Sequence, residues 1–498
     1  MTHARWVSDD AMRPDRQPWD LVVVGGGTAG LVAAQTAAGL GASVLMLERE
    51  RTGGDCLWTG CVPSKALLAA AHCAADARTA GRYGVHVGDV QVDFAAVMRH
   101  VHQAIAAVEP KDSPVKVRMS GVRVAQGEAV FTGEDRVSFT PAGAAGSQTV
   151  RFRHCVIATG SAPSMPGIPG LSDVDPLTSE TVWRLTELPA RLVVIGGGSI
   201  GCELGQAFAR LGSQVTIVES AERLLSPEDA RSAKFVHDAL VRDGVRVLTG
   251  ASLERFEPIG PSGHSGGRAH LGDGTELAFD AVLVATGRTP RTKGLGLASA
   301  RVASDERGHV EVDGHLQTSN PRIYAAGDVT PNPKFTHVAG VHGSLAGSNA
   351  VLGIPRSIDA AAPPRVTFTQ PELAAFGVTP AQAADDDSMT VRVITHDEVD
   401  RAVAERRTDG LTQVVLDKRG KIVGASIVSP RAGESLAELV LAAKGGLGAQ
   451  DVAGVIHSYP TFNDGVWDAS IAQLRDKLNS TAVKRATGLL AAIQRRRS

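Results

Sequence analysis

One segment decides how this chain is interpreted: GGDCLWTGCVPSK, residues 53–65. It places Cys56 and Cys61 five residues apart at the expected start of a helix, with Pro63 suited to the first helical turn. A helix N-terminus lowers the pKa of a thiol and stabilises the thiolate, and Lys65 adds a positive charge. Zinc would need two further ligands nearby, which the segment does not supply. The segment therefore predicts a redox-active cysteine pair and no metal site.

A glycine motif precedes this segment. Residues 25–30, GGGTAG, follow the apolar run 21–24 and open a probable helix. Gly25 permits a tight turn, Gly27 lets the backbone approach a pyrophosphate, and Gly30 lets the helix pack on the sheet. Glu48 ends the probable next strand and can accept a hydrogen bond from a ribose hydroxyl. This pattern predicts a dinucleotide site.

The same device recurs at residues 196–201, GGGSIG, with Gly196, Gly198 and Gly201 in the three glycine positions. Glu219 then ends the strand expected at 215–218. Two such sites imply two dinucleotides, for which one tightly held flavin and one exchangeable nicotinamide is the economical interpretation. Glu219 favours NAD(H), because its charge would repel the 2′-phosphate of NADP. Arg223, four residues later, leaves NADP(H) possible.

Further apolar runs indicate how the chain is organised. Two of them end in Ala-Thr-Gly, at 158–160 and 285–287, and another leads into Gly327-Asp328. Strands alternating with helical stretches predict an α/β fold with two nested Rossmann-like dinucleotide-binding domains, the second inserted into the first. After residue 364 the stretches 366–368, 391–394, 412–416 and 422–427 are typical of an antiparallel sheet, and helical patterns follow from about Glu434.

Composition narrows the class of protein. The chain has 498 residues, which suggests about three domains, and a formal net charge of -2, which argues against a nucleic-acid partner. Five cysteines cannot form a disulfide scaffold in so long a chain. No apolar run is long enough to span a membrane, and residues 1–20 lack the apolar core of a signal peptide. We expect a cytoplasmic enzyme without a membrane or nucleic-acid partner.

These motifs together resemble the pyridine nucleotide-disulfide oxidoreductases, a family that includes lipoamide dehydrogenase, glutathione reductase and mercuric reductase. The resemblance spans roughly residues 19–475. It implies FAD as the flavin, a C-terminal α+β dimerisation domain, and a homodimer in which that domain completes the partner's active site. It also implies that Cys61 lies nearest the flavin and forms the charge-transfer thiolate, while Cys56 is the interchange thiol that attacks the substrate.

The resemblance assigns further residues. Lys65 would lie near flavin N5 and pair with Glu203, Asp328 would hold the ribityl chain, and residues 127–129 would pass the adenine. The remaining cysteines, Cys73, Cys155 and Cys202, match no redox position and are expected to be buried structural thiols. The complete set of expected cofactor-binding residues is Gly25, Gly27, Gly30, Glu48, Gly54, Lys65, Gly127, Ala129, Thr159, Gly160, Ser161, Gly196, Gly198, Gly201, Glu219, Gly287, Asp328 and His337.

The domain boundaries follow from the same resemblance. We expect a flexible segment at 1–18, the two parts of an FAD-binding domain at 19–165 and 290–358, an NAD(P)-binding domain at 166–289, a dimerisation domain at 359–480 and a basic tail at 481–498. We interpret the basic tail as a solvent-exposed helix end.

The C-terminal segment HSYPTFND, residues 457–464, departs from the family. Disulfide reductases usually carry His-Pro-Thr with a Glu three residues later, and that histidine handles the proton of the leaving thiol. Here Tyr459 occupies the histidine position and Asp464 replaces the Glu, while His457 lies two residues early. In an extended segment His457 shares a face with Tyr459 and would still reach the site. A neutral tyrosine is a poor base near pH 7, which puts rapid dithiol turnover in doubt.

Several electron acceptors remain open. The tyrosine resembles mercuric reductase, yet no cysteine follows Cys202, so delivery of a metal ion through a C-terminal cysteine pair is excluded while direct reduction at Cys56 and Cys61 is not. Glutathione reductase is disfavoured, because Gln35 stands where that group has an arginine for the substrate carboxylate. Ser199 likewise stands where it has a tyrosine that gates the nicotinamide. We expect an FAD enzyme that passes electrons from NAD(P)H to the Cys56–Cys61 disulfide and on to a disulfide or thiol-reactive acceptor, small molecule or small protein. Dihydrolipoamide, a soft metal ion and a quinone are alternatives; a flavin-bound redox sensor or complex subunit is the rival of another class.

Overall fold

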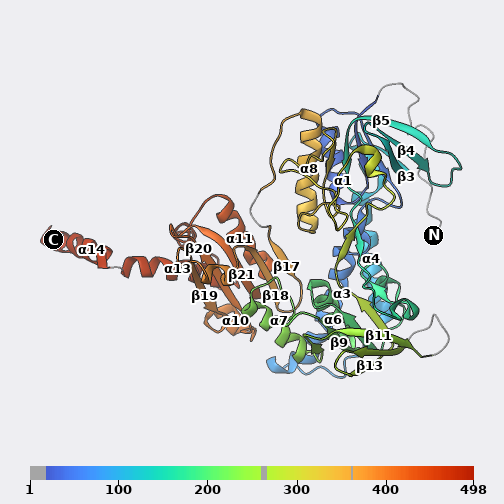
Figure 1. Cartoon of the computed structure of the whole chain (residues 1–498). Coiled ribbons are helices and arrows are strands. Elements are labelled where there is room, and N and C mark those ends of the chain that lie inside the picture. The colour runs from blue at the N-terminus through green and yellow to red at the C-terminus, as the bar shows by residue number, and fades with distance from the viewer. Residues whose placement is uncertain (1–17, 260–265, 360–362, 480, 498) are drawn as a thin grey trace. The chain divides into compact units, whose positions relative to one another are not determined.

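The computed structural model describes residues 18–259, 266–359, 363–479 and 481–497 (Figure 1). The chain divides into two compact units, and each is described by itself. Unit 1 comprises Met1–Pro189, Pro258–Gly266 and Ala281–Ala360, and unit 2 comprises Ala190–Glu257, Gly267–Asp280 and Ala361–Ser498. Of the predicted flexible segment 1–18, all but Pro18 lies outside the described residues.

The core of unit 1 is a parallel sheet. The apolar run that precedes the first glycine motif forms β1 (Trp19–Val24), which pairs in parallel with β2 (Val44–Glu48) and β5 (Gln148–Ile157). β3 (Arg123–Gly133) extends the sheet beside β2, and β16 (Ile323–Ala325) extends it beside β5. β4 (Arg136–Pro141) joins β3 and β5 through antiparallel pairing. Its order β3-β2-β1-β5-β16 is that of a doubly wound nucleotide-binding sheet.

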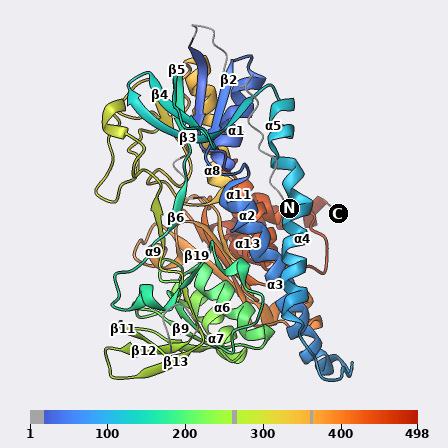
Figure 2. The same ribbon diagram turned by 90° about the vertical axis from the view of Figure 1, so that its right-hand side faces the viewer.

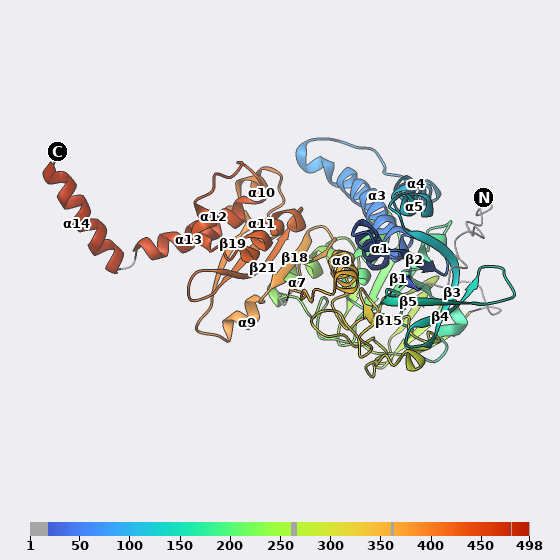
Figure 3. The same ribbon diagram turned by 90° about the horizontal axis from the view of Figure 1, so that it is seen from above.

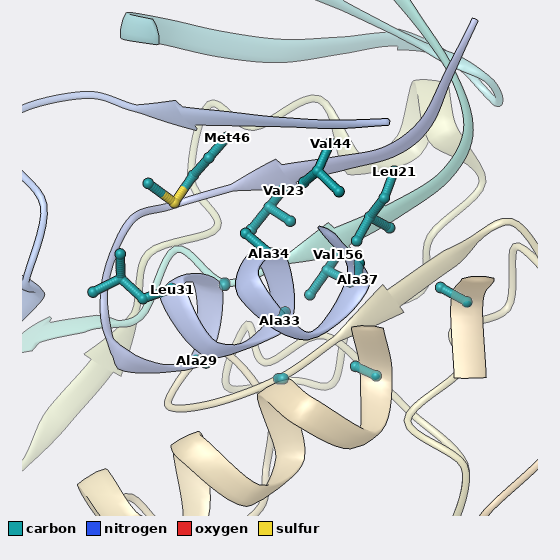
Figure 4. Close-up of a cluster of buried hydrophobic side chains, with 14 of the residues drawn as sticks. Leu21, Val23, Ala29, Leu31, Ala33, Ala34, Ala37, Val44, Met46 and Val156 are labelled. Atoms are coloured by element: carbon teal, nitrogen blue, oxygen red, sulfur yellow. The ribbon is translucent and has the colours of Figure 1, made fainter. Parts of the chain in front are cut away.

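Two helices stack on one face of this sheet. Alanines of α1 (Thr28–Gly39) lie against Val23, Val44 and Met46, as Figure 4 shows. α8 (Thr336–Leu352) packs on α1, and Gly343 and Gly347 allow the approach, since a Cβ at either position would lie within 2.6 Å of an α1 carbonyl oxygen. Figure 1 shows the two helices side by side.

The cysteine segment leads into a pair of packed helices. α2 (Gly54–Trp58) is a single turn that leads into α3 (Cys61–Thr79), which packs along α4 (Phe94–Asp112), as Figure 2 shows. The other elements of unit 1 are α5 (Pro114–Met119), the parallel pair β7 (Leu177–Thr178) and β14 (Ala281–Val284), and the antiparallel pair β6 (Ser161–Pro163) and β15 (Arg288–Pro290).

Unit 2 begins with the second glycine motif. β8 (Arg191–Ile195) leads into α6 (Ser199–Leu211), and the chain returns as β9 (Gln214–Val218), parallel to β8. β10 (Arg246–Leu248) pairs in parallel with β9 after α7 (Ala230–Arg242). A small sheet of β11 (Leu253–Pro258), β12 (Gly267–Leu271) and β13 (Glu276–Phe279) follows. This is the βαβ unit that the sequence predicts.

The C-terminal part of unit 2 is an antiparallel sheet covered by helices (Figure 3). Its strand order is β17-β18-β21-β20-β19. The strands are β17 (Arg365–Thr367), β18 (Glu372–Gly377), β19 (Thr390–Thr395), β20 (Leu411–Leu416) and β21 (Ile422–Ser429). The helices are α9 (Pro380–Ala384), α10 (Asp400–Ala404), α11 (Ala432–Lys444), α12 (Ala449–Ala453), α13 (Asp464–Asn479) and α14 (Thr481–Arg497).

The predicted α/β class, with Rossmann-like sheets and a C-terminal α+β domain, is confirmed. The two cysteines do not share one helix start, however, because Cys56 lies in α2 and only Cys61 opens α3. Cys155 and Cys202 are buried as expected, whereas the expectation for Cys73 is wrong: it is exposed, since it lies off the buried face of α3. No helix among the described residues is long and apolar enough to cross a membrane.

A buried histidine gives the antiparallel sheet a pH-dependent stability. His396 is completely buried, and its Nε2 lies 3.0 Å from the Thr412 hydroxyl. Among the described residues its Nδ1 has no partner. Burial lowers the pKa of His396 from 6.5 to about 4. Because the unfolded chain binds the proton more readily, this contribution is complete above pH 6.5 and is lost as the pH falls towards 4.

We therefore expect the stability gained from a neutral His396 to fall by about 2 kcal/mol between pH 7.5 and pH 5, at about 1.4 kcal/mol for each unit of pKa shift. Urea unfolding of the wild type and of His396→Asn, at fixed protein and FAD concentrations, measures this. The free energy of unfolding of the variant should depend less steeply on pH over that range. Parallel pH dependences would contradict the role of His396.

Candidate active site

The first glycine motif forms a tight turn with an uncapped helix behind it. Gly25 has φ +107°, a conformation that favours glycine, and a Cβ at Gly30 would lie 1.9 Å from the Gly25 carbonyl oxygen. Glu48 accepts from the backbone N–H of Gly26 at 2.6 Å and from that of Glu50 at 2.7 Å. Burial raises the pKa of Glu48. The carboxylate at the strand end thus anchors the turn.

The N-terminus of α1 has the features that a pyrophosphate requires. Gly27 is the N-cap of α1 and supplies no side-chain cap to the first amides. A Cβ at Gly27 would meet only the Cα of Gly54, at 3.7 Å, so the cysteine segment borders this helix N-terminus. The Thr159 hydroxyl is buried and has no hydrogen-bond partner among the described residues. A bound dinucleotide would offer hydrogen-bond acceptors to the open amides of α1 and a partner to the buried Thr159 hydroxyl.

The second glycine motif repeats this geometry in unit 2. Gly196 has φ +105°, Gly198 caps α6 without a side chain, and Gly201 lies against the Gly196 carbonyl. Glu219 accepts from the N–H of Gly197 at 2.6 Å and from that of Ala221 at 2.8 Å. The structure therefore builds two equivalent dinucleotide turns.

Arg223, because of which the sequence left NADP(H) possible, forms hydrogen bonds within its own loop. Its guanidinium donates to the carbonyl oxygens of Leu225, Ser226 and Glu228 at 2.9, 2.6 and 2.7 Å. These bonds hold the loop that follows β9. The arrangement leaves Glu219 as the charged group at the end of this strand.

Two helix N-termini meet at the cysteine pair. Cys61 is the first residue of α3, and its Sγ lies 3.3 Å from the hydroxyl of Thr336, the first residue of α8. Both helix dipoles therefore favour a negative charge on this sulfur. A hydrogen bond to Cys61 and burial both raise the pKa of Cys56. This supports a reduced state in which Cys56 is the thiol and Cys61 the thiolate.

Two tryptophans hold the loop between the cysteines. Trp58 donates to the Thr52 carbonyl at 2.7 Å, and the Arg51 guanidinium lies 3.8 Å from the centre of its ring. Trp183 donates to the Thr59 carbonyl at 2.9 Å. Because the Trp58 indole and the Thr59 carbonyl are both engaged, the loop between the two cysteines is held in place.

A polar cluster surrounds the strand that follows the first Ala-Thr-Gly. Ser161 donates to Asp328 at 2.8 Å, and Arg288 donates to the Ser161 hydroxyl at 2.7 Å. Arg288 also forms an ion pair with Asp55, the residue before Cys56. Gly160 (φ +69°) and Gly287 (φ +134°) lie at the turns that lead into β6 and β15.

The other predicted cofactor residues are distributed as follows. A Cβ at Gly127 on β3 would lie 2.2 Å from the Thr140 carbonyl oxygen, and Ala129 lies on the same strand. The His337 ring stacks on Phe335 with centroids 5.4 Å apart. Lys65 belongs to unit 1, where it donates to Ser64 at 3.4 Å. Glu203 belongs to unit 2, where it is buried and accepts from the Phe368 N–H at 3.0 Å. The pairing of Lys65 with Glu203 stays a prediction.

Both ring nitrogens of His457 lie within hydrogen-bond distance of other groups in the same domain. Its Nε2 lies 2.8 Å from Glu438 and its Nδ1 lies 3.0 Å from the Val455 carbonyl. Glu438 also accepts from Asn463 at 2.6 Å. These two contacts fix the orientation of the ring within its own domain. This arrangement favours a supporting role for His457 over that of a base.

Tyr459 is exposed and pairs with a carboxylate that the sequence pattern does not reveal. Its side chain is 72% exposed, and its hydroxyl donates to Asp400 at the start of α10. This hydrogen bond raises the pKa of Tyr459. Asp464 instead accepts from the backbone N–H and the hydroxyl of Thr461, at 3.1 and 3.0 Å. Asp464 thus shapes the loop, and Asp400 is the partner of the tyrosine.

Sequence reasoning missed Thr336, Arg288, Asp400 and Glu438. Arg288 directly follows the second Ala-Thr-Gly, a signal that was available. The other three lie far along the chain from their partners, and no local spacing marks them. Among the described residues, no three His, Cys, Asp or Glu side chains are placed to hold a metal ion.

Comparison with protein families gives two matches. Residues 19–343 match the family described as pyridine nucleotide-disulphide oxidoreductase, and residues 363–470 match its dimerisation domain. The chain is 36% identical over 447 residues to a mercuric reductase of Streptomyces lividans, covering 89% of this chain and 94% of the relative. It is also 36% identical over 460 residues to a dihydrolipoyl dehydrogenase of Geobacillus stearothermophilus, covering 91% and 95%.

Solved structures of similar fold cover nearly the whole chain. LpdA of Mycobacterium tuberculosis superposes with a TM-score of 0.83 at 25% identity, over 91% of this chain and 99% of that one. The HOCl-induced flavoprotein disulfide reductase RclA of Escherichia coli, in complex with Cu(II), superposes with a TM-score of 0.82 at 26% identity, over 92% and 99%.

Proposed function

Because the chain belongs to the pyridine nucleotide-disulphide oxidoreductase family, an FAD-dependent family that oxidises NAD(P)H, we propose that its Cys56–Cys61 pair passes electrons to a thiol-reactive acceptor. One observation carries the proposal: Cys61 lies where the N-termini of α3 and α8 meet, with the Thr336 hydroxyl 3.3 Å from its sulfur. An inert structural cysteine has no need of two helix dipoles and a hydroxyl donor.

The residues of unit 1 fit FAD. The first turn of α1 and the neighbouring Gly54 would bind the pyrophosphate, and Thr159 offers a buried hydroxyl without a partner. When bound, FAD supplies the ring through which the two electrons of a nicotinamide hydride reach a disulfide. The remaining members of the predicted set would complete its site: Gly25, Gly30, Glu48, Gly127, Ala129, Gly160, Ser161, Asp328 and His337.

The two cysteines then act in turn. As the Cys56 thiol gives up its proton to water, its sulfur attacks one sulfur of an acceptor disulfide, a Cys56–sulfur bond forms, and the other sulfur leaves as a thiolate that takes up a proton. The Cys61 thiolate attacks Cys56, which re-forms the Cys56–Cys61 disulfide and releases the second product thiol. The two electrons lost by NAD(P)H are thus gained by the acceptor.

We further propose a homodimer, as the match to the dimerisation domain supports. Large apolar side chains on that domain are exposed in the single chain, with Leu441 73% and Ile456 99% accessible. In a dimer these would be covered, and Tyr459 and Asp400 would approach the partner's cysteine pair. Since Tyr459 is a poor base near pH 7 and both nitrogens of His457 are engaged by Glu438 and Val455, acceptors that need no general base are favoured.

A soft metal ion is the second candidate acceptor. Tyr459 replaces the usual histidine, and thiolates are the preferred ligands of soft metal ions. The relatives include mercuric reductases, and the structure of RclA was solved with Cu(II). The ion would have to reach Cys56 and Cys61 directly, because the chain has no cysteine after Cys202.

An NADH-oxidation assay across acceptors tests the proposal. The panel consists of lipoamide, an aromatic disulfide, Hg(II), Cu(II) and a quinone, each with the wild type and with Cys56→Ser. We expect activity with at least one thiol-reactive acceptor and its loss in the variant. Activity with the quinone alone, unchanged in Cys56→Ser, would contradict the proposal, and no turnover with any acceptor would favour a redox sensor.

NADH should be preferred to NADPH, by at least about tenfold in kcat/KM, which corresponds to about 1.4 kcal/mol. Glu219 faces the position of the 2′-phosphate in this type of site, and Arg223 is bound to three carbonyls. Steady-state kinetics with the two donors measures the preference. Glu219→Ala should reduce the preference for NADH. A tenfold preference of the wild type for NADPH would show that Glu219 has been misinterpreted.

A further inference from the structure

Arg288 joins two carboxylates that come from distant parts of unit 1. It forms an ion pair with Asp55, and its Nε lies 3.5 Å from Asp328 Oδ2. It also donates to the Ser161 hydroxyl at 2.7 Å and to the Ser161 carbonyl at 3.0 Å. The Arg288 side chain is only 16% exposed. This guanidinium is therefore a fixed, largely buried charge between two acids.

Arg288 is the cation that forms the ion pair with Asp55, and Arg291 attracts this acid more weakly. Arg291 lies nearby and donates to the Ser161 carbonyl at 2.8 Å, but its own charge is paired with Glu180 at 2.5 Å. Burial raises the pKa of Asp55, which Arg288 opposes. Without Arg288, two carboxylates would share this region with little compensation, which is costly at partly buried sites.

The location of Asp55 makes this charge balance important. Asp55 follows Gly54, whose Cα is adjacent to Gly27 at the N-terminus of α1. The cysteine segment is tied to the same turn, since the Gly53 N–H donates to the Gly26 carbonyl at 2.9 Å. That turn is where the diphosphate of a dinucleotide binds. An uncompensated Asp55 would repel it.

We infer that Arg288 retains FAD by neutralising Asp55 and Asp328, acting as a positioning residue beside the diphosphate; the inference rests on the proposed FAD site. The same guanidinium links the residue before Cys56 to the acid expected to hold the ribityl chain.

A double-mutant cycle on the full chain tests this. FAD is removed from purified wild type, Arg288→Gln, Asp55→Asn and the double variant, and the Kd for added FAD is measured by flavin fluorescence. Arg288→Gln should raise the Kd at least about tenfold. Asp55→Asn should bind at least as tightly as the wild type, and the double variant should return to within about threefold of it.

Restoration of FAD binding by Asp55→Asn distinguishes a role of Arg288 in charge balance from a merely structural one. If Arg288→Gln acted by disturbing the fold, adding Asp55→Asn would not restore FAD binding, and that result would overturn the inference. Arg288→Lys, which keeps the charge, should bind FAD more tightly than Arg288→Gln. A wild-type chain that binds no FAD would instead refute the proposed function, so the two failures are distinguishable.

Discussion

The Cys56→Ser and Cys61→Ser enzymes are each expected to lose disulfide reduction by more than about 10³-fold, because a covalent exchange has no substitute for either sulfur. They should differ in their spectra. Cys56→Ser keeps Cys61 at the two helix N-termini and should show the long-wavelength absorption of a thiolate against the flavin without any reductant. Cys61→Ser should show none.

Cys73→Ser provides the matched control. Cys73 lies in α3 and is exposed, as Cys61 is, but it lies well away from the N-terminus of that helix, so its loss should leave turnover unchanged. An ordinary flavin spectrum in Cys56→Ser, or equal residual activity in all three variants, would refute the assigned roles of the two sulfurs.

Dihydrolipoamide oxidation should be slow in the wild type, below that of a histidine-containing relative by about 10² to 10⁴, the range that a general base contributes. The oxidation requires a base for the incoming thiol. Tyr459 donates to Asp400, which raises its pKa, and both nitrogens of His457 face acceptors. Steady-state turnover of dihydrolipoamide with NAD⁺ measures the deficit.

Tyr459→His should recover part of this activity. Asp400 already accepts from the side chain at position 459 and would orient an imidazole there, so a second change, Asp400→Asn, should reduce the gain. Adding Asp464→Glu brings the segment closer to the family pattern, although Asp464 already accepts a hydrogen bond from the Thr461 hydroxyl. Rapid wild-type turnover that His457→Ala abolishes would instead make His457 the base.

The sequence predicts the nucleotide turns well because their information is local. Gly25, Gly30 and Glu48 lie within one βαβ unit, and each is required by the backbone of that unit. The same holds for the second turn and Glu219. The start of α3 at Cys61 likewise follows from a few neighbouring residues, although the separate turn α2 around Cys56 does not.

The environment of the reactive groups could not be predicted in this way. Thr336 reaches Cys61 from 275 residues away, and Asp400 reaches Tyr459 from 59. The interior strand β18 escaped recognition because its residues, ELAAFG, lack the β-branched character typical of strands. The physiological acceptor also cannot be read from the sequence, since in the proposed dimer its contacts would come from side chains far apart along the chain.

Anaerobic reduction by NADH, followed by alkylation, tests the central claim most directly. One equivalent of NADH is added to the oxidised enzyme, free thiols are alkylated, and the labelled cysteines are located by mass spectrometry. Two new labels should appear, on Cys56 and Cys61, together with the long-wavelength thiolate absorption, while Cys73, Cys155 and Cys202 remain unchanged. Bleaching of the flavin by the first equivalent, with no new thiol at Cys56 or Cys61, would contradict the proposal that electrons pass through this disulfide.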